Sequence, residues 1–147
     1  MKISIFDLHQ LKTYKNVVIL VKYNDRWLFV QRKGSTEWEI PFGEIEQHEK
    51  PIDAAKRHLR EKTGALNFSI KPVFDFWTAD DSSQDNGMAF YAEISELGKL
   101  SNDYKAEKTG QFKSMPACLK YPEITALLFD ELIKYNSKEK LKKQYAE

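Results

Sequence analysis

Three ionisable side chains, His58, Glu61 and Lys62, stand at i, i+3 and i+4 spacing and are the first candidates for chemistry. Residues at this spacing share one face of a helix and lie close together. An imidazole and a carboxylate can ligate a transition-metal ion, whereas the ammonium group of Lys62 repels a cation. Two interpretations of His58 therefore stay open, a weak metal ligand or an ordinary polar residue on the helix surface.

The segment that carries these residues has the start and stop signals of a helix from Pro51 to Thr63. Proline suits the first helical position, Asp53 favours the positive end of the helix dipole, and Gly64 can adopt the left-handed conformation that ends a helix. An apolar stripe at helical spacing comprises Ile52, Ala55 and Leu59. We expect this stripe to face the core and the three ionisable residues to lie on another face.

Strand-like segments precede this helix. Asn16–Tyr23 and Arg26–Gln31 are rich in β-branched and aromatic residues, and Asn24 and Asp25 between them suit a two-residue hairpin turn. After a further extended stretch, Pro41 is expected to end the strand and start a loop.

The C-terminal half predicts more strand and a last helix. Strands are expected at Phe68–Thr78, at Met88–Ser95 and, more weakly, at Thr109–Ser114, with a polar loop at Asp80–Asn86. A helix is expected over about residues 122–135, followed by a lysine-rich, fraying tail at 137–147.

Composition limits the class of protein. The chain has 147 residues, a formal net charge of +1 and a single cysteine. This length suits one domain over residues 1–147, and Cys118 alone can form neither an internal disulfide nor a cysteine-based metal cluster. No stretch resembles a signal peptide or a membrane span, so we expect a cytoplasmic α/β protein.

Between Gly43 and Ala65 the chain reads GEIEQHEKPIDAAKRHLREKTGA, which resembles the Nudix box, G-x5-E-x7-R-E-U-x-E-E-x-G-U with U apolar. The matching positions are Gly43, Glu49, Arg57, Leu59, Glu61, Gly64 and Ala65. The resemblance to the Nudix hydrolase family implies an α/β/α sandwich around a mixed β-sheet, with the box at residues 43–65. It also implies that Glu49 and Arg57 form a bracing ion pair, and that Gly43 and Gly64 are structural.

The resemblance further implies a chemistry. Carboxylates of the box bind Mg²⁺ or Mn²⁺ in this family, the metal polarises a diphosphate, and a base activates water. By this resemblance the protein hydrolyses a nucleoside diphosphate linked to another moiety. Glu61 would bind metal and act in catalysis, and Glu107 would supply a carboxylate base.

Two positions depart from the pattern. His58 and Lys62 stand where the family has metal-binding glutamates, so the charge of the triad changes from about −3 to about 0. Weak or absent Mg²⁺ binding is expected, with His58 at most a weak ligand. The alternative function is a non-catalytic module that binds a nucleotide, a phosphometabolite or a protein.

Candidate substrate contacts come from cations and aromatic residues. Arg32 and Lys62 can pair with a phosphate group, although Lys62 can equally be a solvated helix residue. Trp77 can stack on a nucleobase, although an aromatic residue in a strand is more often part of the core. The expected partner is a small molecule that contains a diphosphate, with neither nucleic acid nor membrane; the oligomeric state is not predicted.

Overall fold

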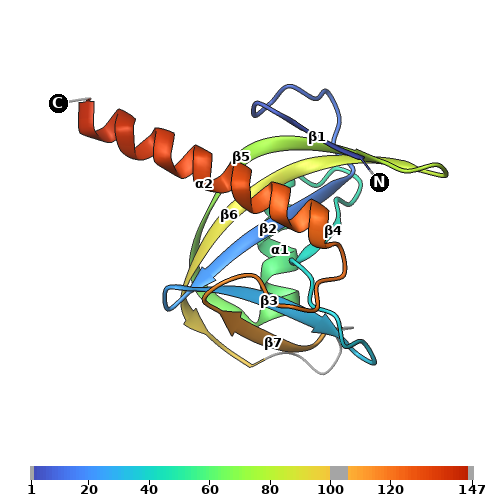
Figure 1. The fold of residues 1–147 in the computed structure, drawn as a ribbon, viewed down its shortest axis with the longest axis vertical. Coiled ribbons are helices and arrows are strands. Elements are labelled where there is room, and N and C mark those ends of the chain that lie inside the picture. The colour runs from blue at the N-terminus through green and yellow to red at the C-terminus, as the bar shows by residue number, and fades with distance from the viewer. Residues whose placement is uncertain (1, 100–105, 146–147) are drawn as a thin grey trace.

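A mixed seven-stranded sheet with a helix on each face forms the described part of this computed structural model (Figure 1). The description covers residues 2–99 and 106–145, without the side chains of residues 106, 107 and 140–145. In chain order the elements are β1 (Lys2–Phe6), β2 (Asn16–Tyr23), β3 (Arg26–Arg32), β4 (Phe42–Glu44), α1 (Pro51–Thr63), β5 (Ala65–Ala79), β6 (Gln84–Leu97), β7 (Ala106–Phe112) and α2 (Pro122–Tyr145). The α/β/α sandwich expected from the sequence is confirmed.

The strands lie in the order β1-β5-β6-β2-β3-β7, and β4 pairs with β2. The β2–β6 pair is parallel, and the other named pairs are antiparallel. The predicted β2–β3 hairpin is confirmed, with Asn24 and Asp25 at φ 52° and 59°. Two consecutive positive φ angles are typical of the hairpin turn whose twist matches that of the flanking strands.

One edge of β2 is shared between two partners. Its first residues, Asn16 to Val18, pair with β4, and its last, Val21 to Tyr23, pair with β3. The sequence predicted a loop, and no strand, at β4. Its three residues gain strand geometry only because the first half of β2 offers a free edge there, and this pairing sets the start of the box against the sheet.

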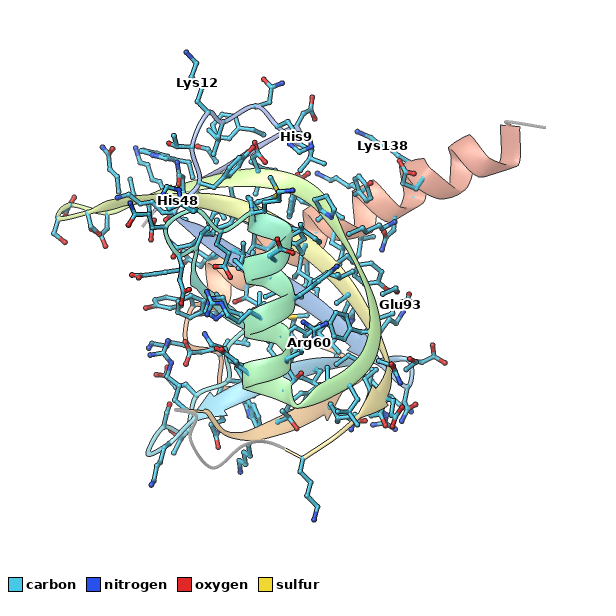
Figure 2. The ribbon with its side chains drawn as sticks, turned by 180° about the vertical axis from the view of Figure 1, so that it is seen from behind. His9, Lys12, His48, Arg60, Glu93 and Lys138 are labelled. Carbon is cyan, nitrogen blue, oxygen red and sulfur yellow. The ribbon has the colours of Figure 1, made fainter. Side chains whose placement is uncertain are left out.

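Helix α1 begins and ends where the sequence predicted. Pro51 occupies its first turn, and Gly64, at φ 77°, donates its N–H to the carbonyl of Arg60. Seen from behind, α1 lies across the sheet with Arg60 on it, and His48 lies on the loop that leads into it (Figure 2). The fully buried Ala54, Ala55 and Leu59 turn toward the sheet.

The two faces of the sheet carry separate cores. On the α1 side, Val17, Ile19 and Phe90 are buried with the helix, and on the α2 side Phe29, Phe74 and Leu132 form a second cluster. The alternation of side chains along β2 assigns Ile19 to one cluster and Leu20 to the other.

The structure corrects several expected boundaries. The last helix continues past residue 135 to Tyr145, and its end projects beyond the sheet, with Lys138 on the projecting part (Figures 1 and 2). The expected polar loop at 80–86 is shorter, because β6 begins at Gln84. In both places the backbone continues its regular structure through polar residues.

The N-terminal strand β1 was not predicted. It pairs with β5, and the loop after it is fastened by the buried carboxylate of Asp75, which accepts hydrogen bonds from the Leu11 amide at 2.9 Å and the Tyr14 hydroxyl at 2.8 Å. No helix in the described ranges is long and apolar enough to cross a membrane.

Candidate functional site

The loop between β4 and α1 is held by the ion pair of Glu49 and Arg57. The guanidinium group donates to both carboxylate oxygens, each over 2.9 Å, and Nη2 also donates to the carbonyl of Glu44 over 3.2 Å. These hydrogen bonds from Arg57 lower the pKa of Glu49 to about 2, and the pKa of Arg57 is raised in return. The geometry agrees with the bracing role that the family resemblance implied for this pair.

His58 is buried, with only 8% of its surface exposed, so the surface placement considered from the sequence is wrong. Its Nε2 lies 2.8 Å from the Glu44 carbonyl, and its ring fills the space over Gly43, where a Cβ would lie 2.0 Å from Cε1. The pKa of His58 is lowered, and burial of the ring is the largest cause of this shift. The imidazole is therefore neutral and donates from Nε2, so this nitrogen has no lone pair for a metal.

Lys62 turns toward β4 and donates to the carbonyl of Phe42. Its ammonium group lies 5.0 Å from the centre of the Phe42 ring, and the guanidinium carbon of Arg32 lies 5.3 Å from that centre. Burial and, next, the positive charge of Arg32 lower the pKa of Lys62 to about 8. Lys62 is therefore a half-buried cation beside a second cation, Arg32. The alternative considered from the sequence, a solvated lysine on the helix surface, is wrong.

Glu61, the one triad carboxylate that the box retains, is paired within its own helix. Its Oε2 lies 3.6 Å from Nη1 of Arg57, one turn before it. Arg57 thus contacts the carboxylates of both Glu49 and Glu61.

The residues present do not fit a bound Mg²⁺. Hard cations of this size take oxygen ligands, and the carbonyl oxygens of Phe42 and Glu44 and the Glu49 carboxylate already accept hydrogen bonds from nitrogen donors of α1. Lys62 donates a hydrogen bond to the carbonyl of Phe42, and His58 and Arg57 both donate to the carbonyl of Glu44. Within the described ranges no three His, Cys, Asp or Glu residues group as a metal site.

A cleft of about 210 Å³ opens on the α2 face of the sheet. Val18 and Phe76 form part of its sheet wall, Thr125 part of its helix wall, and Phe42 and Glu39 belong to its lining as well. Because Phe42 also contacts Arg32 and Lys62, the cleft and this pair of cations adjoin.

Glu39 is a member of the site that the sequence did not single out. Its side chain is 3% exposed, its Oε2 lies 3.0 Å from Nε of Arg32, and its Oε1 lies 3.8 Å from Nζ of Lys120. Neither carboxylate oxygen makes a hydrogen bond of good geometry within the described part of the chain. The only signal in the sequence was an acidic residue inside an otherwise strand-like stretch.

The remaining predicted site residues lie elsewhere. Alternation along β5 places Trp77 on the face opposite Phe76 and Thr78, which line the cleft. Glu107 lies in β7, and its side chain is outside the described residues. The structure thus brings together Arg32, Lys62 and the residues of the box, and leaves Trp77 apart from them.

Comparison with known proteins agrees with this architecture. An RNA pyrophosphohydrolase of Bartonella clarridgeiae is 42% identical over 92 residues, which cover 56% of this chain and 53% of that protein. This chain therefore spans about half the length of that relative.

Two solved structures share the fold. A pyrophosphohydrolase of Bacillus subtilis superposes with a TM-score of 0.77 at 19% identity, covering 90% of this chain and 89% of that one. The NUDIX domain of Shewanella oneidensis NrtR, solved with ADP ribose, gives a TM-score of 0.61 at 17% identity, covering 86% and 94%.

The family itself is shown by the sequence. A model of the NUDIX domain matches residues 13–117, which include the β2–β3 hairpin, the box and most of the sheet. Because this match spans more than half of the chain, the protein belongs to the NUDIX domain family.

Proposed function

We propose that this chain is a pyrophosphohydrolase homologue whose cleft takes a nucleoside diphosphate linked to another moiety. The observation that carries the proposal is the position of Phe42, which lines the cleft and is contacted by both Arg32 and Lys62. One ligand can then place an uncharged ring system in the cleft and its phosphates against the two cations.

The size of the cleft supports this orientation. Its volume of about 210 Å³ is below the ~300 to 1,000 Å³ of pockets that enclose a whole drug-sized ligand. A single base or comparable ring fits, and the charged part of the ligand stays at the mouth. Direct pairing of arginine and lysine with phosphate oxygens is a strong, charge-assisted interaction.

Hydrolysis of the diphosphate is the first candidate activity. Membership of the family supports it, as do relatives that are themselves named pyrophosphohydrolases. Glu61 and Glu107 are the carboxylates we propose for metal binding and for the base, and Mg²⁺ or Mn²⁺ is the cofactor that the family implies.

Binding without hydrolysis is the second candidate, and a specific observation favours it. The ammonium group of Lys62 and the imidazole of His58 bond to the carbonyl oxygens of Phe42 and Glu44 in β4, so these two oxygens are already used where a divalent ion would need ligands. The S. oneidensis NUDIX domain, solved with ADP ribose, supports ADP-ribose as a first ligand to test.

One experiment tests the proposal and separates its candidates. Binding and hydrolysis are measured for ADP-ribose, nucleoside triphosphates and an RNA with a 5′-terminal triphosphate, each with Mg²⁺ and with EDTA. Thr125→Phe fills the cleft and should weaken ligand binding about tenfold or more, which is about 1.4 kcal/mol. Leu127→Phe, at an exposed position of the same helix, is the matched control.

The outcomes are distinct. Metal-dependent release of phosphate or nucleotide establishes the hydrolase, and tight binding without product establishes the binding module. The proposal fails if no diphosphate binds in either buffer, or if Thr125→Phe binds as wild type does while its melting curve shows a folded protein.

A further inference from the structure

Lys62 brings a positive charge to the part of the box where the family resemblance implies a divalent ion. We propose that Lys62 replaces that ion: its ammonium group, together with Arg32, binds the diphosphate directly, and the site works without a divalent metal. The inference rests on the proposed function, because it takes the diphosphate ligand from there.

The first support is that the oxygens of β4 are already used. Lys62 donates to the carbonyl of Phe42, and His58 and Arg57 both donate to the carbonyl of Glu44. A divalent ion would have to displace these hydrogen bonds and then sit beside an ammonium group. At short range, like charges in a partly buried site repel far more strongly than in water.

The second support is the close fit of His58 against Gly43. Its imidazole lies directly on Gly43, in space that even a methyl group at that position would occupy. The glycine and the histidine therefore fit each other, and the backbone of β4 is closed against α1 by a neutral ring instead of a carboxylate.

The third support is the arrangement of cations around Phe42. Arg32 and Lys62 both contact the Phe42 ring, at 5.3 Å and 5.0 Å from its centre, and the positive charge of Arg32 lowers the pKa of Lys62. Arg32 also pairs with Glu39, as does Lys120. Arg32 keeps 42% of its side chain exposed, so its guanidinium group is within reach of a ligand. An anion between Arg32 and Lys62 would relieve their mutual repulsion.

The proposal predicts how the unliganded protein responds to metal. Mn²⁺ binding is followed by the loss of the free-ion electron paramagnetic resonance signal in wild type, Lys62→Glu and Lys56→Glu. Lys62→Glu should bind Mn²⁺ about tenfold or more tightly than wild type, because a carboxylate replaces the repelling cation. Lys56→Glu makes the same charge change elsewhere on α1 and should stay within about twofold of wild type.

A wild type that binds one Mn²⁺ as tightly as Lys62→Glu overturns the inference. Circular dichroism and thermal melts establish that the variants fold. If Lys62→Glu does not fold, Lys62→Gln removes only the positive charge, and it must then bind Mn²⁺ at least about threefold more tightly than wild type. An unchanged affinity in that variant also overturns the inference.

A second measurement follows the ligand. ADP-ribose is titrated calorimetrically into wild type and Lys62→Met, each in EDTA and in MgCl₂. Wild type should bind equally in both buffers, within about twofold, and Lys62→Met should lose about tenfold or more in EDTA. Binding by wild type that requires Mg²⁺ overturns the inference and leaves the proposed function intact.

A wild type that binds neither ADP-ribose nor the other diphosphates in either buffer overturns the proposed function, and the diphosphate half of this inference with it. The Mn²⁺ measurement still decides separately whether Lys62 excludes the metal.

Discussion

Replacing Glu49 by glutamine should remove most of the electrostatic contribution of the brace between the β4–α1 loop and α1. The glutamine side chain would keep nearly the same shape and one acceptor oxygen, but not the charge that pairs with Arg57. The pKa of Glu49 is lowered from 4.5 to about 2, chiefly by the hydrogen bonds from Arg57. At about 1.4 kcal/mol per pKa unit this difference corresponds to about 3 kcal/mol, and since the side chain keeps some contact with solvent we expect about 2 kcal/mol at pH 7.

The dependence on pH has a definite sign. Because the folded pKa is lower than the unfolded one, the unfolded chain binds more protons between pH 4.5 and about 2. The stabilisation is therefore complete above pH 4.5 and is lost as the pH falls toward about 2. The difference between wild type and Glu49→Gln should accordingly shrink to about 1 kcal/mol or less near pH 3.

Urea unfolding at pH 7, 5, 4 and 3 measures this difference, and other titrating groups cancel between the two proteins. Glu46→Gln is the matched control. Its carboxylate lies 3.7 Å from the same guanidinium group, but its side chain is 71% exposed. Its removal should cost no more than about 0.5 kcal/mol. Equal costs for Glu49→Gln and Glu46→Gln, or a cost that does not change with pH, would refute the reasoning.

Three further predictions concern the same helix. Arg57→Ala should lower the free energy of unfolding by about 2 to 4 kcal/mol and Lys62→Ala by clearly less, because only the loss of Arg57 leaves the half-buried carboxylate of Glu49 unpaired. Thermal melts in which Lys62→Ala costs more would contradict this. Gly43→Ala should cost about 1 to 3 kcal/mol by overpacking against His58, and adding His58→Ala should restore part of it; no recovery in the double variant would show that the ring is not the obstacle. His58→Glu with Lys62→Glu should create or raise Mg²⁺-dependent diphosphatase activity about tenfold or more, equal to about 1.4 kcal/mol of barrier, with much less from either change alone. A folded, metal-binding double variant that stays inert on every substrate would place the loss of activity outside the box.

The sequence alone predicted the local features of this site, because they depend on residues close together in the chain. The bounds of α1 follow from Pro51 and Gly64, and the turn of the hairpin follows from Asn24 and Asp25. The box motif, by its family resemblance, also predicted the pair of Glu49 and Arg57, whose bidentate contact the structure confirms.

The environment of His58 and Lys62 could not be read from the same motif. Helical spacing places both on one side of α1, but it does not say what that side meets. Only the pairing of β4 with the first half of β2 brings the carbonyls of Phe42 and Glu44 against the helix. A strand of three residues has too little pattern of its own to be predicted, so neither the burial of His58 nor the contact of Lys62 was predicted.

The cleft required still more distant contacts. Glu39 pairs with Arg32 because a β-bridge joins Glu39 to Val30 of β3. It pairs with Lys120 because the segment before α2, far along the chain, packs beside it. Trp77 was predicted as a substrate contact because it is aromatic. Side chains alternate along β5, whose pairing with β6 fixes their direction, so Phe76 and Thr78 line the cleft instead. Composition, local spacing and the box motif thus determined the fold class, the helix and the brace. Long-range strand pairing decided which side chains share the cleft, because contacts between segments distant in the chain leave no periodic signal in either segment.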